Sequence, residues 1–303
     1  MKRLLSLLFL LFFINANANA NEISVGSFNI EWFGHGNAPR TEEQIKKIAN
    51  YIKSLEIDVL ACQEINPKGD KSGNNIKDWV DLKNYLGSSF DARYGKTGRG
   101  QRLAYIWRID RVQLSDFGEL KDIRRESFDD SDKRTFPRIP YTAYVKSKVG
   151  GLDFRIITVH LYFGKDKARY MEAKVLNNWV KNYQTGQNDK DVIIIGDFNT
   201  KPMGFNESHN SKTISNLEKG NILISVSKNH YEFTTPTSRE RYDHAFLSTD
   251  LMKEYICGSW DVHREKVAEN ATQYLHDISN HVPVSLKLKD EDNDDFTSGD
   301  FGK

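Results

Sequence analysis

The chain contains little cysteine. Cys62 and Cys257 are its only cysteines, and no Cys-x-x-Cys spacing occurs, so the cysteines cannot form a zinc site by themselves. Cys62 lies in an apolar, strand-like segment, which is typical of a buried free thiol. A disulfide between Cys62 and Cys257 is the alternative if the protein is exported.

Long apolar runs are also scarce. The longest lies in residues 1–20, where Lys2 and Arg3 precede a Leu/Phe-rich run and an Asn-Ala repeat. This order is that of a secretory signal peptide cleaved before Asn21, although an uncleaved membrane anchor is the alternative. Because the run is too short to span a bilayer, we expect a secreted or periplasmic protein without stable membrane association.

The chain has almost no net charge. Its formal charge is +1, which becomes −1 once Lys2 and Arg3 are removed, so its overall charge does not predict a polyanionic partner. The sequence also lacks the Walker spacing of a nucleotide-binding loop and the Gly-x-Ser-x-Gly elbow of serine hydrolases. These absences argue against a phosphate-cradling P-loop and a serine triad.

The remaining chain is long enough for one large domain, which we place at residues 21–289. Residues 290–303 are acidic and poor in apolar side chains, so we expect a disordered tail. The tail lacks the glycine and the final glutamate of an EF-hand calcium loop.

Residues 191–200, DVIIIGDFNT, are the clearest strand. The run from Val192 to Ile195 has no polar alternation, which predicts a strand covered on both faces at the centre of a sheet. Asp197 and Asn199 follow where the strand leaves the sheet, which is where α/β proteins bind ligands. An ordinary turn is the alternative interpretation of this Gly-Asp-x-Asn sequence.

Other apolar segments carry polar residues at the corresponding position. A single Glu or His at a strand end is usually a solvated or structural residue, but the repetition predicts one cavity mouth lined by strand ends. The residues concerned are Asn29, Glu64, His160, Asp197, Asn199, Asp243, Asn280 and His281.

Helices alternate with these strands. Thr41 precedes a segment with apolar residues at helical spacing, and residues 166–183 form a second such segment with Met171, Val175, Trp179 and Val180 facing inward. Strand-helix alternation interrupted by hairpins predicts an α/β protein with a mixed sheet and covering helices.

The strand-end residues suit phosphate ester chemistry. Oxygen ligands without a thiolate favour Mg²⁺, Mn²⁺ or Ca²⁺ over zinc, and two histidines beside carboxylates suit general acid and base catalysis. A carboxylate-held cation can neutralise a phosphoryl oxygen while water attacks phosphorus. Phosphoester hydrolysis is therefore the reaction that these residues fit.

Two basic features accompany the strand ends. Residues 95–102, GKTGRGQR, form either a solvated hairpin or a mobile arm that places Lys96, Arg99 and Arg102 on phosphates. Arg138 lies between Pro137 and Pro140, which stiffen its backbone.

The segments FNIEWFG, DVLACQE, TVHLYFG, IIIGDFNT, YDHAFL and SNHVPV resemble, in order, the endonuclease/exonuclease/phosphatase superfamily and its deoxyribonuclease I-like branch. The resemblance spans residues 23–288 and implies a four-layer sandwich of two mixed β-sheets packed face to face with helices outside. It also implies site roles. The metal ligands would be Glu64, Asp197, Asn199 and Asn280. The residues that bind the substrate phosphate would be Asn29, Arg99, Arg138 and Asn199. The catalytic residues would be His160, His281, Asp243, Asp197 and Asn199.

Two residues depart from the family pattern. Asn280 stands where the family has Asp, which keeps an oxygen ligand but removes a negative charge. Gln101 stands where the branch has a Glu that partners the first histidine; Gln101 can bond to His160 but stabilises its protonated form less well.

The sequence therefore predicts a monomeric, exported nuclease that uses Mg²⁺, or Mn²⁺ or Ca²⁺, to hydrolyse DNA. The alternatives are a phosphomonoesterase, a phospholipid-directed phosphodiesterase and a non-catalytic nucleic-acid-binding relative.

Overall fold

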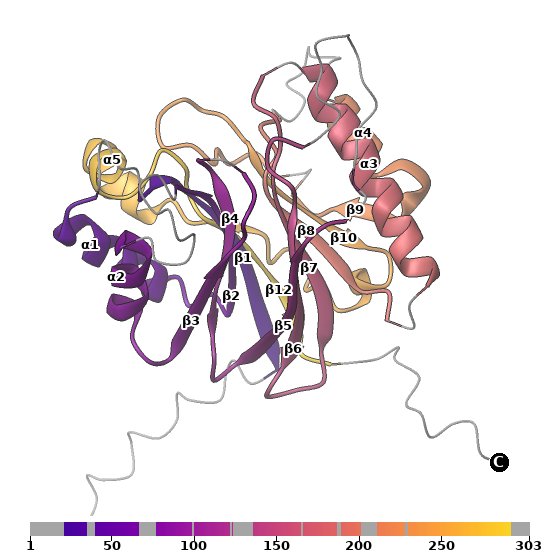
Figure 1. Ribbon diagram of the computed structural model, residues 1–303, viewed down its shortest axis with the longest axis horizontal. Helices are drawn as coiled ribbons and strands as arrows, with labels where there is room; N and C mark the ends of the chain where they lie inside the picture. The colour runs from indigo at the N-terminus through magenta and orange to yellow at the C-terminus, as the bar shows by residue number, and fades with distance from the viewer. Residues whose placement is uncertain are drawn as a thin grey trace, which may run out of the picture.

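Two six-stranded sheets pack face to face, with helices on both outer faces (Figure 1). This arrangement confirms the four-layer sandwich. The computed structural model describes residues 21–34, 40–66, 77–98, 100–121, 123, 136–164, 166–186, 189–200, 211–227 and 230–291. The predicted signal peptide, Arg99 and the predicted tail after Glu291 lie outside these residues.

The two sheets have the same plan. In each, one central pair of strands is parallel and the other pairs are antiparallel. The first sheet has the order β11 (Asp261–Val262), β12 (Val284–Lys289), β1 (Glu22–Phe33), β2 (Val59–Ile65), β4 (Arg102–Arg108) and β3 (Phe90–Tyr94). The second has the order β5 (Val112–Glu119), β6 (Tyr141–Ser147), β7 (Asp153–His160), β8 (Val192–Asp197), β10 (Asp243–Ser248) and β9 (Leu223–Ser225).

The helices form the two outer layers. The first sheet is covered by α1 (Glu42–Ser54), α2 (Lys77–Leu86) and α5 (Glu265–Asp277), and the second by α3 (Asp166–Thr185) and α4 (Ser211–Leu217) (Figure 1). Two short 3-10 turns, η1 (Lys219–Asn221) and η2 (Leu251–Lys253), precede β9 and follow β10. No helix within the described part of the chain is both long enough and apolar enough to cross a membrane.

Strand β8 is buried on both faces, as its apolar run predicts. Ile193 and Ile195 belong to the core between the sheets. Val192 and Ile194 belong to the second core, which also contains apolar residues of α3. Because side chains of a strand point alternately to opposite faces, a fully apolar strand needs a layer on each side. The sandwich provides both layers.

Helix α1 starts as its sequence predicts, whereas the inward face of α3 differs. Thr41 and Gln44 form a reciprocal capping box at the start of α1. In α3, of the four residues predicted to face inward, Val180 is fully buried and Val175 and Trp179 pack partly buried against the second core, while the buried set also includes Glu172. The Glu172 carboxylate accepts a hydrogen bond from the backbone N–H of Tyr162 at 2.8 Å, so this buried side chain has a polar partner.

The cysteines do not form a disulfide. Both are free: Cys62 is buried within β2, and Cys257 is exposed. Burial raises the pKa of the Cys62 thiol, which agrees with the inert buried thiol expected from its apolar surroundings.

The topology gathers the polar strand ends at one edge. Strands β1 and β2 run parallel and end there, as do β7 and β8. Strands β10 and β12 are antiparallel to their neighbours β8 and β1, so they begin at the same edge. Residues far apart in the sequence therefore meet at one end of the sandwich.

Candidate active site

Three titratable residues lie side by side in the second sheet. His160, at the end of β7, and Asp243, at the start of β10, both pair in register with Asp197 at the end of β8. Gly196 allows this close approach, because a Cβ on it would lie 2.2 Å from the carbonyl oxygen of Val159. Its φ of 151° is also rare for residues with a side chain.

Asn29 joins the two sheets at this edge. Its side-chain Nδ2 donates to Glu64 Oε1 and to Asp197 Oδ2, both at 3.1 Å, while its Oδ1 accepts from the backbone N–H of Glu31. Glu64 comes from the first sheet and Asp197 from the second. One buried amide thus fixes the relative position of two carboxylates.

Two imidazoles point at the same carboxylate. His160 Nε2 lies 3.4 Å from Asp197 Oδ2 and 3.8 Å from Glu64 Oε1. His281 Nε2 lies 3.6 Å from Asp197 Oδ2, and its Nδ1 lies 2.9 Å from Asp243 Oδ2. The carboxylate of Asp243 therefore orients His281, as the resemblance implies.

Arg138 fixes the backbone at the end of β7. Its Nε donates to the His160 carbonyl, one terminal nitrogen to the Leu161 carbonyl, and the other to Gln101 Oε1 at 2.8 Å. Asn199 Nδ2 also donates to the Leu161 carbonyl. The bond from Gln101 to His160 that the sequence allows is not formed; Gln101 Oε1 instead accepts from the guanidinium of Arg138.

Asn280 lies at the rim. It is exposed, and its backbone N–H donates to Glu31 Oε2 at 3.1 Å. The preceding residue, Ser279, bridges β1 and His281, because its hydroxyl donates to the Asn29 carbonyl and accepts from the His281 N–H. The segment before β12 is thereby tied to the end of β1.

These residues surround a cavity of about 620 Å³. Of the site residues predicted from the sequence, Glu64, Arg138, His160, Asp197, Asn199, Asn280 and His281 line it. Asn29 and Asp243 lie behind this lining and bond to its carboxylate and imidazole. The predictions missed Trp32, Phe163, Tyr242 and residues 235–238, which also line it. Trp32 and Phe163 could have been found from the sequence, because each is an aromatic residue shortly after a polar residue at a strand end.

Burial and neighbouring charges separate the proton affinities of the two histidines. Burial lowers the pKa of His160 well below its usual value, and the charges of Arg138 and His281 add to this effect. Burial also opposes the charged form of His281, but Asp243 and Asp197 raise the pKa of His281 to about 9. Burial, partly offset by His281, raises the pKa of the Asp197 carboxyl to about 6.

The site residues fit a hard divalent cation. The side chains of Glu64 and Asp197 are only 12% and 2% exposed, and one amide nitrogen holds an oxygen of each. Oxygen donors of this kind suit Mg²⁺, Mn²⁺ or Ca²⁺. Glu64 and Asp197 would hold the ion, and Asn199 and Asn280 line the same cavity.

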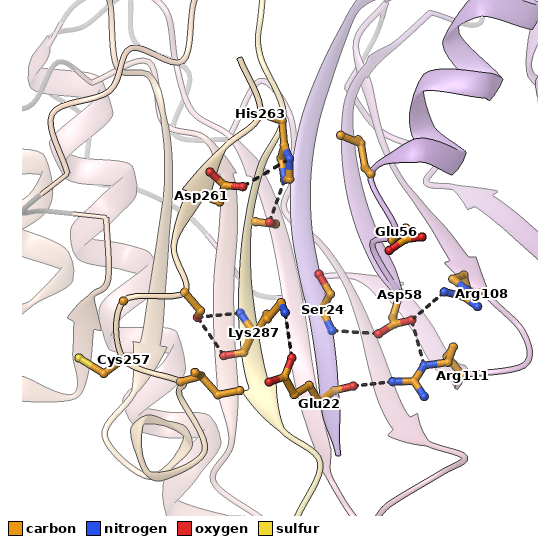
Figure 2. A pocket seen from close by; sticks show the side chains of 15 residues that line it. Glu22, Ser24, Glu56, Asp58, Arg108, Arg111, Cys257, Asp261, His263 and Lys287 are labelled. Carbon is orange, nitrogen blue, oxygen red and sulfur yellow. Dashed lines mark hydrogen bonds and ion pairs between the residues drawn. The ribbon is translucent and has the colours of Figure 1, made fainter. Parts of the chain in front are cut away.

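A second hollow of about 410 Å³ contains charged side chains that already pair with one another (Figure 2). Asp58 Oδ1 lies 3.2 Å from Arg111 Nε and 3.8 Å from Arg108. Glu22 pairs with Lys287 at 2.9 Å. These pairs tie β1 and β12 to the β4–β5 turn, which gives the hollow a structural explanation.

At the edge of this hollow, Asp261, His263 and Glu265 each offer a metal-ligand atom, all within 4.8 Å of one another. His263 Nε2 lies 2.9 Å from Ser285 Oγ, and Asp261 is mostly exposed. This group provides a control position for experiments on metal dependence.

The chain shares its fold with several solved proteins. An endonuclease/exonuclease/phosphatase family protein from Bacteroides thetaiotaomicron is 18% identical, with a TM-score of 0.64 over 88% of this chain and 95% of that one. A mannosyl-6-phosphatase from the same species is 18% identical, with a TM-score of 0.60 over 87% and 98% of the two chains. TDP2 from Caenorhabditis elegans is 14% identical, with a TM-score of 0.60 over 88% and 74%.

The sequence comparisons give the family. A search of curated proteins found no match. Residues 26–281 match the family described as "Endonuclease/Exonuclease/phosphatase family", and this range contains every site residue described above. The chain therefore belongs to the endonuclease/exonuclease/phosphatase family.

Proposed function

We propose that this protein is an exported, monomeric nuclease that hydrolyses phosphodiester bonds in DNA with Mg²⁺ as cofactor, Mn²⁺ and Ca²⁺ being the alternatives. Members of its family are metal-dependent phosphoesterases. The observation that carries the proposal is the convergence of His160 and His281 on Asp197, at 3.4 and 3.6 Å. Two imidazoles at one carboxylate suit proton transfer to and from a phosphate ester.

In the proposed reaction, a water oxygen bonds to phosphorus, and the bond from phosphorus to the leaving sugar oxygen breaks. The water loses a proton, and the sugar oxygen gains one. One of the two imidazoles accepts the water proton at Nε2, and the other donates its Nε2 proton to the sugar oxygen. Both Nε2 atoms face Asp197, and Asp243 holds Nδ1 of His281. A bound cation would neutralise charge on a phosphoryl oxygen.

The remaining site residues hold this arrangement. Both donor contacts of the Asn29 amide go to Glu64 and Asp197, so we assign Asn29 to positioning the two carboxylates. Arg138 fixes the carbonyl of His160 and lines the cavity, where its positive charge favours a phosphate.

The basic loop before β4 supports a nucleic-acid substrate. Gln101, at the end of this loop, lines the cavity. A Cβ on Gly100 would lie 3.6 Å from Cζ3 of the Trp32 ring, so the described part of the loop runs along the rim. We propose that the basic side chains of this loop contact the polyanionic backbone of the substrate.

A substrate panel tests the proposal. The mature protein is incubated with supercoiled plasmid DNA, mannose 6-phosphate, and vesicles containing phosphoinositide or sphingomyelin, each with Mg²⁺ or Mn²⁺ and with or without EDTA. We expect nicking of the plasmid that EDTA abolishes, and little phosphate or headgroup release. If the protein hydrolyses the monoester or a lipid in an EDTA-sensitive way and leaves the plasmid intact, its function is that activity and not a nuclease activity. DNA binding without cleavage would indicate a non-catalytic relative.

Asn280→Asp is expected to lower the Mg²⁺ concentration for half-maximal nicking by about tenfold. An added carboxylate on the cavity wall attracts the cation, and a tenfold change in affinity corresponds to about 1.4 kcal/mol, below the roughly 4 kcal/mol of a close charge pair near a protein surface. Rates are measured against Mg²⁺ concentration. Asp261→Asn, which removes a carboxylate from the group outside the cavity, should leave the midpoint unchanged. Equal Mg²⁺ midpoints for wild type and Asn280→Asp would show that Asn280 does not belong to the metal site.

A further inference from the structure

Two of the exposed aromatic side chains lie at the candidate site. Within the described residues, Trp32 is 46% exposed, Phe163 73%, Tyr231 77% and Phe233 37%. Trp32 and Phe163 line the cavity, and Tyr231 and Phe233 shortly precede the lining residue Thr235. Exposure of large aromatic side chains costs free energy unless a partner covers them, and their clustering at one site indicates a common ligand.

The Trp32 backbone is held in an unusual conformation. Its φ is 48°, a left-handed value that is unfavourable for a bulky residue. Its backbone N–H donates to Glu64 Oε2 at 3.1 Å, which compensates for part of this cost. Glu64, a residue of the hydrolytic site, thus holds the backbone that carries the Trp32 indole.

Phe163 follows the end of β7, in the other sheet. Arg169, on α3, donates to the carbonyls of Tyr162 and Phe163 at 3.0 and 3.3 Å, which fixes the backbone that carries the exposed ring. Each sheet therefore contributes one exposed aromatic residue to the cavity wall.

Hydrogen bonds also hold residues 233–236, which include the lining residues Thr235 and Pro236. Arg264 donates to the carbonyls of Phe233, Thr235 and Pro236, which tie residues 233–236 to the start of α5. The Arg241 guanidinium lies over the Tyr231 ring, 5.7 Å from its centroid.

We propose that Trp32 and Phe163 form a nucleobase-binding site that stacks unpaired bases next to the scissile phosphate, so that single-stranded DNA is cleaved faster than duplex DNA. The inference rests on the nuclease function proposed above. An unpaired base offers its full π face to an aromatic side chain, and such stacking is tolerant of sequence. Paired bases in a duplex are stacked on one another and present only their edges to a protein.

The test uses three DNA substrates with the same backbone: a single-stranded oligonucleotide, its duplex, and an oligonucleotide whose central tract carries abasic tetrahydrofuran residues. The value of kcat/KM is measured for wild type, Trp32→Ala, Trp32→Phe and Phe163→Ala. Val149→Ala is the control, because Val149 is 49% exposed in the β6–β7 turn and does not line the cavity.

We expect wild type to cleave the single strand about tenfold faster than the duplex or the abasic tract. Trp32→Ala and Phe163→Ala should each reduce the ratio of single-strand to abasic cleavage by about threefold, with Trp32→Phe restoring most of it and Val149→Ala leaving it unchanged. Equal rates on single-stranded and duplex DNA, or unchanged ratios in the alanine variants, would overturn the inference while leaving the nuclease function in place. Absence of EDTA-sensitive cleavage of every substrate would instead overturn the proposed function.

Discussion

Replacing His281 by alanine is expected to reduce kcat for DNA cleavage by about 10²–10⁴-fold, the usual contribution of a general acid or base. The variant loses the only imidazole in the described site that a carboxylate orients through Nδ1, at 2.9 Å from Asp243. Asp243→Asn should also reduce kcat, because the amide cannot stabilise the charged imidazole. Single-turnover cleavage of plasmid DNA at saturating Mg²⁺ measures both variants.

His276→Ala is the matched control for this prediction. His276 has a side chain that is 72% exposed at the end of α5 and contacts Asp277, outside the cavity. We expect the His276→Ala variant to cleave DNA at the wild-type rate. We expect His281→Ala to keep the wild-type circular dichroism spectrum and the wild-type Mg²⁺ affinity. Cleavage by His281→Ala at a rate similar to that of wild type would mean that this residue does not transfer a proton in the reaction.

Gly196→Ala is expected to reduce the free energy of unfolding by about 4 kcal/mol, the sum of backbone strain and overpacking. The new Cβ would lie 2.2 Å from the Val159 carbonyl oxygen in the adjacent parallel strand, and backbone cannot move as a side chain can. The melting temperature should fall by about 10 °C. Thermal and urea unfolding of the purified variant measure both quantities.

Gly118→Ala is the matched control, because a Cβ at Gly118 would meet no atom within 4 Å. Its stability should change by less than about 1 kcal/mol. A Gly196→Ala protein as stable as Gly118→Ala would contradict the close approach of β7 and β8 that aligns His160 with Asp197.

Sequence patterns predict the strand ends because two simple physical rules apply there. The apolar run from Val192 to Ile195 requires cover on both faces, and the β8 side chains occupy two separate cores. Polar residues that recur where such runs end must reach the same sheet edge if neighbouring strands are parallel. Asp197 and His160 meet in register for this reason.

Contacts that depend on competition between side chains are not predictable in this way. Gln101 is in reach of the site from its sequence position, but Arg138 rather than His160 takes its oxygen. The burial of Glu172 on α3 likewise does not follow from hydrophobic periodicity, because it depends on a backbone N–H that binds the carboxylate. Trp32 is exposed at the cavity, and hydrophobicity alone does not distinguish it from a core residue.

The most direct test of the account compares plasmid nicking by wild type and Asp197→Asn after removal of metal with EDTA and titration with Mg²⁺. Asp197 accepts a hydrogen bond from Asn29 and lies within 3.6 Å of both imidazoles, so the substitution removes the charge at the centre of the site. We predict that metal-free wild type is inactive and recovers with Mg²⁺, whereas Asp197→Asn stays inactive at every Mg²⁺ concentration. Nicking by metal-free wild type, or nicking by Asp197→Asn at the wild-type rate, would contradict the account.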